Sequence, residues 1–582
     1  MRESILRAAV LAGVAVVAIT ELLSPLHLLR WWTVAAAWLL AAALIARQLP
    51  RPQRARWRPV EGTLALLTVA VAAVVALVAI LSPPNSADAM AYHLPRVVYW
   101  AQSGSVAFFP TPYLNQIMLQ PLAEYFMLHT YLLSGGDRLI NVVAFGAYLG
   151  SIVGVAAIAQ ALGLGTRAQA WAALFCATLP NAILQGSGAK NDFLLAFYLV
   201  CAVYFTARRN APYAALAAAL ALATKGTAYL FLPPVLVYAA AVLPRRRLLW
   251  IPAAACLING PQYARNLQLS GSPLGFDSAQ ANGVFRWRNE HLTWRPLVSN
   301  ALRHLSEQLG MRSPAWNQAV YQRTVRLHQA LGLDAQDGDT TWPGARFEPP
   351  RNANHEANAN SHWQLLLLLA AALAALFARN RVWTLYAAGL LAAFLLFCWY
   401  LKYQPFLARL ELPLFVAAAP LAAYLVDRLR HPAVALVLGL FLVNNARPAL
   451  FENWTRPLKG PRSLFATTRN DNYFSDMGQW DNKASYVEAV DRLARSGCTR
   501  VGLDISENQL EYPVQVLLRQ RVPGAWFVHT GVTGPSAKYA DGSERTVCAV
   551  LCPDCTGNDQ KRQLYGNFGV PLDIGRFWLF VK

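Results

Sequence analysis

Charged residues are scarce in this chain of 582 residues: they make up 14% of it, whereas 55% of the residues are hydrophobic. Soluble domains carry about 25% charged residues, so the scarcity favours a chain that lies in lipid. Cysteine is also rare, with 8 residues, which excludes a small disulfide-rich scaffold. The high hydrophobic content excludes an intrinsically disordered chain.

Apolar runs that approach the thickness of a bilayer recur along most of the chain, and they predict about 13 membrane-spanning helices. The runs cover residues 5–22, 32–44, 64–81, 139–162, 171–184, 193–205, 211–223, 229–243, 248–258, 363–377, 382–399, 412–426 and 433–443. We therefore expect a mainly α, polytopic membrane domain over residues 1–445. It includes two long outer loops, at 82–138 and 260–362.

Acids number 31 against 51 Lys and Arg, which gives a net charge of +20. A charge of this sign suits nucleic acid or an acidic membrane surface. The arginines, however, gather near the N-terminus and in every second loop between the apolar runs, including Arg51, Arg54, Arg56, Arg245–Arg247, Arg428 and Arg430. This is the pattern of cytoplasmic loops. It predicts a multi-pass protein of a bacterial inner (cytoplasmic) membrane with a cytoplasmic N-terminus, and no nucleic-acid partner.

The tail, residues 446–582, reads as a small soluble α/β or α+β domain on the periplasmic side. Residues 486–495 have apolar residues at helical spacing, and residues 500–505 read as a strand. The tail holds four of the cysteines, Cys498, Cys548, Cys552 and Cys555. An even number in an oxidising compartment favours disulfides, with three pairings open. A zinc site built on Cys548, Cys552 and Cys555 is the alternative.

The first outer loop carries an acid, Asp88, a few residues beyond the third apolar run, followed by Tyr92, His93 and Arg96. Such an acid is commonly an exposed loop residue or the N-cap of the helix that follows it. Against that, a second acid, Asp192, recurs in the next outer loop beside Lys190. Lys225 interrupts an apolar stretch, which marks either a functional site or a snorkelling side chain.

In their order along the chain, five short segments resemble the GT-C superfamily of integral-membrane glycosyltransferases. They are the Asp88 loop, 189–192 (AKND), 223–226 (ATKG), 260–275 (GPQYARNLQLSGSPLG) and 403–413 (YQPFLARLELP). The resemblance is to the aminoarabinose transferases of lipid A and to the protein O-mannosyltransferases. It implies a glycosyltransferase (EC 2.4) with a polyprenyl-phosphate-linked sugar donor and a hydroxyl acceptor on a glycan, lipid, cell-surface polysaccharide or protein.

Such a transfer needs a base for the acceptor hydroxyl and cations for the leaving phosphate. We expect Asp88 to be the base and Asp192 a second acid of the site. Inversion at the anomeric carbon is expected, because the sequence shows one base and no nucleophile pair. The candidate phosphate ligands on the outer face are Lys225, Arg96, Lys190, Arg265, Lys402 and Arg409. Arg265 and Arg409 also read as ordinary juxtamembrane arginines.

Candidates for contact with the acceptor or the sugar are Tyr92, His93, Glu124, Glu356, His362 and Tyr403. His355, Glu356 and His362 are candidates for a metal site, and the same Asn-rich segment reads as a loop with capping residues. No cofactor is assigned with certainty, and a divalent metal ion stays open. Four tryptophans of the second long loop suit sugar stacking or anchoring at the membrane surface.

Two other classes of function remain alternatives. A transporter or lipid flippase would place charges near the midplane of the membrane and break helices in related halves. Here the polar groups gather on one face instead, which favours an enzyme. A receptor or scaffold that binds partners through its tail would leave the loop carboxylates and cations unexplained.

Overall fold

The computed structural model describes residues 1–47, 58–404, 406–429, 431–476, 478–506, 509–553, 555 and 557–582. Arg51, Arg54, Arg56 and Arg430 of the expected topology pattern lie outside these residues, as does Pro405 of the 403–413 segment.

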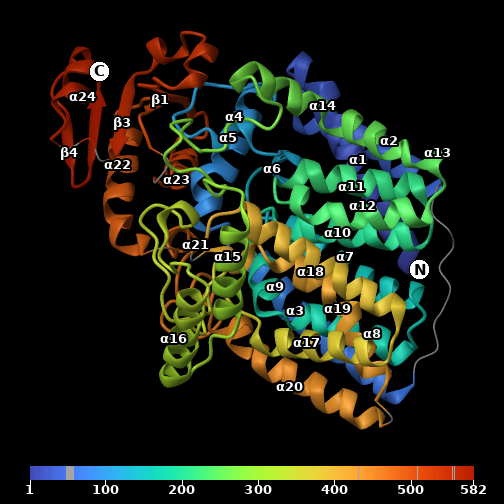
Figure 1. Ribbon diagram of the computed structural model, residues 1–582. Helices are drawn as coiled ribbons and strands as arrows, with labels where there is room; N and C mark the ends of the chain where they lie inside the picture. Colours follow the sequence, from blue (N-terminus) through green and yellow to red (C-terminus); the bar gives the residue numbers. More distant parts are fainter. Residues whose placement is uncertain are drawn as a thin grey trace.

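The chain is mainly helical, with a bundle of apolar helices at one end and a small sheet at the other (Figure 1). The bundle consists of α1 (Arg2–Leu23), α2 (Trp31–Arg47), α3 (Pro59–Leu81), α7 (Val142–Ala161), α8 (Thr166–Thr178), α10 (Asp192–Ala207), α11 (Ala211–Thr224), α12 (Ala228–Val242), α14 (Trp250–Ser270), α17 (His362–Phe377), α18 (Arg381–Tyr400), α19 (Leu412–Asp427) and α20 (Pro432–Phe451). Each predicted apolar run corresponds to one of these helices, except that the run 171–184 is broken at Leu179 between α8 and α9 (Pro180–Gln185).

Five helical segments of the described chain are long and apolar enough to cross a membrane, and six further apolar helices are shorter. The five are Arg2–Leu26, Pro59–Leu81, Val142–Ala161, Arg381–Tyr400 and Pro432–Phe451. The expected count of about 13 spans is therefore not confirmed. Large apolar side chains such as Leu66 and Phe377 are exposed on the bundle, at 67% and 81%. A water-soluble surface rarely shows such residues in number, whereas a lipid-facing one does.

Two glycines allow α7 and α10 to pack closely in the bundle. Gly150 and Gly154 lie one turn apart on α7, which packs against α10. A Cβ atom at Gly150 would lie 2.5 Å from the ring of Phe197, and one at Gly154 would lie 2.3 Å from Val200. Because only glycine leaves room there, the two backbones approach closely, as in other membrane bundles.

The loop segments gather between the bundle and the sheet (Figure 1). Their helices are a π-helical turn η2 (Ala89–His93), α4 (Leu94–Ser103), α5 (Asn115–Met118), α6 (Leu122–Ser134), α15 (Trp294–Gln308) and α16 (Pro314–Ala330). The remaining short helices are α13 (Arg245–Leu248), α21 (Arg469–Asn472) and α24 (Asp559–Leu564), with 3-10 turns at Ser24–Leu26, Gly338–Thr340, Leu407–Arg409, Gln479–Asn482, Pro535–Tyr539, Ser543–Thr546 and Gly566–Phe568.

The C-terminal sheet has five strands in the order β2-β1-β3-β5-β4. They are β1 (Arg500–Leu503), β2 (Trp526–His529), β3 (Ala549–Pro553), β4 (Leu572–Ile574) and β5 (Phe577–Val581). β1 runs parallel to β2 and β3, whereas β5 runs antiparallel to β3 and β4. The predicted helix and strand are present as α22 (Lys483–Arg495) and β1, and Gly497 between them has a positive φ of 72°.

The C-terminal part is docked on the first long loop by buried polar contacts. The Tyr99 hydroxyl of α4 donates to Glu511 at 2.5 Å, just before α23 (Tyr512–Arg521). Gln102, also on α4, donates to the carbonyl of Phe527 at 3.1 Å. α20 runs to Phe451, across the expected boundary at residue 445, and the division into two domains stays a prediction.

Candidate functional site

Asp88 lies in the loop after α3, directly before the π-helical turn Ala89–His93. Its side chain caps no backbone N–H of that turn, so a simple capping role is wrong. Oδ2 of Asp88 instead accepts a 2.5 Å hydrogen bond from Nη1 of Arg409, and it lies 3.9 Å from Nζ of Lys190. Single π-helical turns are frequent at functional sites, and this one presents Asp88 to two cations.

Two lysines reach the same region from breaks between short helices. Lys190 lies in the turn between α9 and α10, and Lys225 lies in the break between α11 and α12. Nζ of Lys225 is 2.5 Å from Oδ1 of Asp192, the first residue of α10. Nζ of Lys190 is 2.6 Å from Oε1 of Glu356. Lys225 therefore holds an ion pair at the helix break rather than snorkelling to a lipid surface.

The charge of Asp88 is set by two opposing effects. Burial disfavours the carboxylate, but the cations around it, led by Arg409 and Lys190, outweigh this and hold its pKa below the usual range. Burial, together with the charge of Asp88, raises the pKa of the neighbouring Tyr92 hydroxyl well above its usual value. In this state Asp88 is an anion bound to a guanidinium, and Tyr92 is a neutral phenol beside it.

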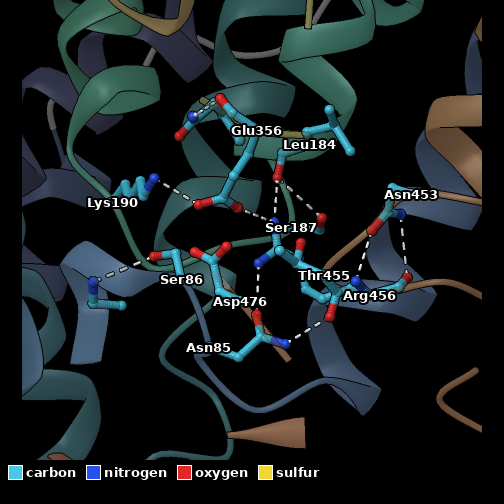
Figure 2. Close-up of polar contacts among 12 residues, drawn as sticks. Asn85, Ser86, Leu184, Ser187, Lys190, Glu356, Asn453, Thr455, Arg456 and Asp476 are labelled. Carbon is cyan, nitrogen blue, oxygen red and sulfur yellow. Dashed lines mark hydrogen bonds and ion pairs between the residues drawn. The ribbon is translucent and has the colours of Figure 1, made fainter. Parts of the chain in front are cut away.

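Glu356 joins the second long loop to the C-terminal tail (Figure 2). Its second oxygen, Oε2, is 2.5 Å from Nη2 of Arg456, and both side chains are fully buried. Arg456 also donates to Oδ1 of Asn85 and to the carbonyl of Leu184, each at 2.8 Å. The guanidinium therefore fastens the Asp88 loop, the end of α9 and Glu356 to one another. Sequence reasoning missed Arg456, because nothing in its neighbourhood along the chain points to these partners.

A second contact from the tail holds the Asp88 loop from the other side. Oδ2 of Asp476 accepts a 2.6 Å hydrogen bond from the backbone N–H of Ala87, the residue before Asp88. Oδ1 of Asp476 lies 2.7 Å from Nε2 of His355. The sequence analysis did not single out Asp476, although His355 and Glu356 both belong to a segment that it did.

His93, Arg96 and Glu124 form a separate buried group. Glu124 Oε1 lies 2.8 Å from Nδ1 of His93 and 3.5 Å from Nη1 of Arg96. Arg96 has no exposed surface, and its Nη2 donates to the carbonyls of Ile117 and Leu119 at 2.9 Å. In the structure this guanidinium holds α4 to the following loop, and the binding of donor phosphate by Arg96 stays a prediction. Glu124 and His93 likewise pair with each other.

Three more predicted site residues are engaged elsewhere. Arg265 makes two hydrogen bonds to Glu21 of α1, at 2.7 and 2.9 Å, and one to the Tyr125 hydroxyl. Lys402 lies 2.6 Å from Glu290, and the Tyr403 hydroxyl donates to Glu307 at 2.7 Å. Arg265 thus joins α14 to α1 and α6, and Lys402 and Tyr403 hold the second long loop; the partners of all three lie outside the Asp88 centre. Glu21, an acid within the first apolar run, is the signal that could have revealed the partner of Arg265.

The metal-site candidates His355, Glu356 and His362 do not form a ligand group in the described part of the chain. His355 and Glu356 are paired as stated above, and His362 is buried at the start of α17. Among the described residues, ligand atoms close enough for one metal ion occur at Asp504, Cys552 and Cys555. The four tail cysteines are paired as Cys498–Cys548 and Cys552–Cys555, which selects one of the three pairings left open and leaves none of the four as a thiolate ligand for zinc.

The centre therefore contains alternating charges from five separate segments. Arg409, Lys190 and Lys225 are each neutralised by a carboxylate, in the order Asp88, Glu356 and Asp192. Lysine and arginine so placed are suited to bind a phosphate, which would compete with those carboxylates for the same donors.

No family model matches the sequence, and no curated protein matches it either. Solved structures do match: the crystal structure of ArnT from Cupriavidus metallidurans in the apo state aligns with a TM-score of 0.51 and 14% identity. It covers 88% of this chain and 97% of that chain. The structure of the same ArnT bound to undecaprenyl phosphate aligns with a TM-score of 0.50 over the same shares, also at 14% identity. The chain thus has the fold of ArnT, which agrees with the fold that the order of its motifs predicts.

Proposed function

We propose that this chain is a membrane glycosyltransferase that moves a sugar from a polyprenyl-phosphate-linked donor to a hydroxyl acceptor. The observation that carries the proposal is the Asp88 centre, where Arg409 and Lys190 converge on one carboxylate in an ArnT-like fold. One of the similar ArnT structures holds undecaprenyl phosphate, which supports a lipid phosphate as the donor's carrier.

The donor phosphate is bound by Arg409, Lys190 and Lys225. Arg409 offers a planar fork of N–H donors, which suits two phosphate oxygens at once. The lysines add positive charge where the leaving phosphate gains negative charge, so they stabilise the transition state more than the ground state. Arg96, Arg265 and Lys402 are left out of this set because their partners lie outside the Asp88 centre.

Asp88 is the general base, and the arrival of the donor activates it. Before the donor binds, the Arg409 guanidinium keeps the pKa of Asp88 low, and a carboxylate so strongly paired is a weak base. Donor phosphate draws Arg409 towards itself and adds negative charge near Asp88, and both effects raise the pKa of the carboxyl group. The freed carboxylate takes the proton of the acceptor hydroxyl while that oxygen attacks the anomeric carbon and the lipid phosphate leaves. A single displacement of this kind inverts the anomeric carbon.

The active centre faces the periplasm of a bacterial cell. The N-terminus lies at one end of the helical bundle, while the loop helices α4 and α15 and the C-terminal sheet lie towards the other (Figure 1). The triple-arginine helix α13 also lies at the N-terminal end in that view, and basic loops favour the cytoplasmic side. The acceptor is a glycan, lipid, cell-surface polysaccharide or protein.

The test uses the purified chain in liposomes with a labelled polyprenyl-phosphate sugar and an extract of membrane acceptors. We expect label to move to an acceptor in a manner that needs both substrates. In a parallel assay, fluorescent lipid is followed across the bilayer without acceptor. Lipid movement at full rate with no sugar transfer to any acceptor would favour the flippase alternative.

A further inference from the structure

A cleft of about 710 Å³ opens beside the Asp88 centre, between the second long loop and the segment that follows α20. Its walls include two tryptophans, Trp454 and Trp480, together with side chains of both charges. The polar residues that line it include Glu452, Lys459, Arg462, Asp476, His355 and Asn358. The sequence analysis left this segment without a role.

The aromatic surface of the cleft is accessible. Trp454 is 67% exposed, and its ring lies 5.8 Å from that of His355, measured between ring centres. Trp480 is half-buried, with the guanidinium of Arg462 at 5.3 Å from its ring centre. A large exposed indole that is held in place by neighbours offers a flat apolar face with polar groups at its rim. This combination matches the alternating C–H faces and hydroxyl edges of a sugar ring.

Asp476 connects the cleft to the reacting centre. It lines the cleft, and its two oxygens bind the Ala87 N–H and the His355 ring at 2.6 and 2.7 Å. A molecule lying in the cleft is therefore separated from the loop that carries Asp88 by one side chain. This placement suits the acceptor, because the acceptor hydroxyl must reach Asp88 while the donor phosphate occupies Arg409 and Lys190.

We infer that the cleft is the acceptor subsite and that the acceptor carries a glycan, whose sugar rings stack on Trp454 and Trp480. This inference rests on the proposed function for its place in the reaction. The binding of sugar in the cleft is separable from it. The competing role for an exposed tryptophan near the end of α20 is to anchor the chain in lipid headgroups. The two acids and two cations in the cleft walls favour a polar, hydroxyl-rich occupant over that role.

The test measures binding of soluble tetrasaccharides, one uncharged and one containing uronic acids, to the full chain in nanodiscs by saturation-transfer NMR. Trp454→Ala and Trp480→Ala are expected to weaken binding by about tenfold each, the loss of one stacking contact. Trp454→Phe keeps an aromatic face and is expected to retain most of the sugar binding. Trp526→Ala, an exposed tryptophan on β2 far from the cleft in sequence, serves as the matched control and leaves binding unchanged.

Sugar binding that neither alanine variant alters would overturn the inference, as would variants that lose only their association with phosphatidylglycerol vesicles. The two proposals fail in different ways. If sugar still binds at the cleft but no sugar is transferred from a lipid-linked donor, the proposed function is wrong and the sugar-binding cleft stands. If both alanine variants transfer sugar normally with an unchanged KM for the acceptor, the cleft is not the acceptor subsite and the proposed function stands.

Discussion

Arg409 donates a 2.5 Å hydrogen bond to Asp88 across 321 residues of sequence, and this contact joins the loop before α19 to the loop after α3. Each ion is the principal partner of the other in the absence of substrate. The site therefore rests in a neutralised state, which avoids the large cost of leaving a partly buried charge unpaired. It also means that a phosphate has to take Arg409 from Asp88, and this exchange is the basis of the first two predictions.

Replacing Arg409 should weaken donor use more than acceptor use. Arg409→Gln removes the charge and the fork of donors, so we expect kcat/KM for the donor to fall by about tenfold to a hundredfold. Arg409→Lys keeps the charge and should recover part of the loss. The matched control is Arg288→Gln, since Arg288 pairs with Asp277 at 2.8 Å in the second long loop. Equal losses in Arg409→Gln and Arg288→Gln would exclude a specific role for Arg409.

The two pH profiles of the enzyme should differ on the acid side. The profile of kcat/KM reports the free enzyme, in which Arg409 and Lys190 hold the pKa of Asp88 below its usual value. Activity in that profile should therefore persist to below about pH 4, the usual Asp value. The kcat profile reports the donor complex, where Asp88 has lost Arg409, so its acid limb should lie at higher pH. Steady-state kinetics at saturating and limiting donor check this, and coincident acid limbs would argue against the exchange of partners.

The sequence predicts the helices of the bundle because their apolar runs are continuous along the chain and long. It predicts Asp88, Lys190 and Arg409 as site residues through short motifs whose order resembles a known family. The tertiary fold brings these three side chains together. Arg96 shows the limit of that reasoning. It is a basic residue in the right loop, yet three-dimensional packing places it against Glu124 and two backbone carbonyls, and no sequence pattern distinguishes this from a phosphate site.

The role of Arg456 could not be predicted from the sequence for a related reason. Its partners Asn85 and Glu356 lie 371 and 100 residues away, so nothing local marks it. The sequence predicts a soluble domain for the tail, and two residues of this tail, Arg456 and Asp476, contact the loop that carries Asp88. An interaction between distant segments leaves no periodicity for sequence reasoning to detect.

The buried Glu356–Arg456 pair should contribute to stability as a unit. Glu356→Gln leaves the buried charge of Arg456 uncompensated and should lower the free energy of unfolding by about 3–5 kcal/mol. Arg456→Met should lower it less, because Glu356 keeps its ion pair with Lys190. The double variant should lose much less than the sum of the two. Thermal unfolding in detergent measures the unfolding midpoint of each variant, and the order of these midpoints checks the prediction. Glu348→Gln, which affects an exposed pair with Arg351, is the control and should change little. Additive losses would contradict the buried coupling.

The Cys498–Cys548 disulfide should stabilise the C-terminal sheet. It closes a segment with a sequence separation of 50 and so restricts the unfolded chain, which corresponds to about 4 kcal/mol in the chain-entropy description. Cys498→Ser/Cys548→Ser should therefore make the tail the first part to be cleaved by protease. Limited proteolysis with and without reductant checks this. Identical cleavage patterns would show that the bond contributes nothing to the domain's stability.

The central claim is that Asp88 removes the proton of the acceptor, and Asp88→Asn tests it directly in liposomes with a labelled polyprenyl-phosphate sugar. We predict that transfer falls by about 10²–10⁴-fold, the usual contribution of a general base. Binding of undecaprenyl phosphate should stay the same or become tighter, because the phosphate no longer has to break an ion pair between Arg409 and Asp88. Asp277→Asn, which removes an acid of the second long loop paired with Arg288, should transfer at the unaltered rate. Transfer by Asp88→Asn at the rate of Asp277→Asn would contradict the assignment.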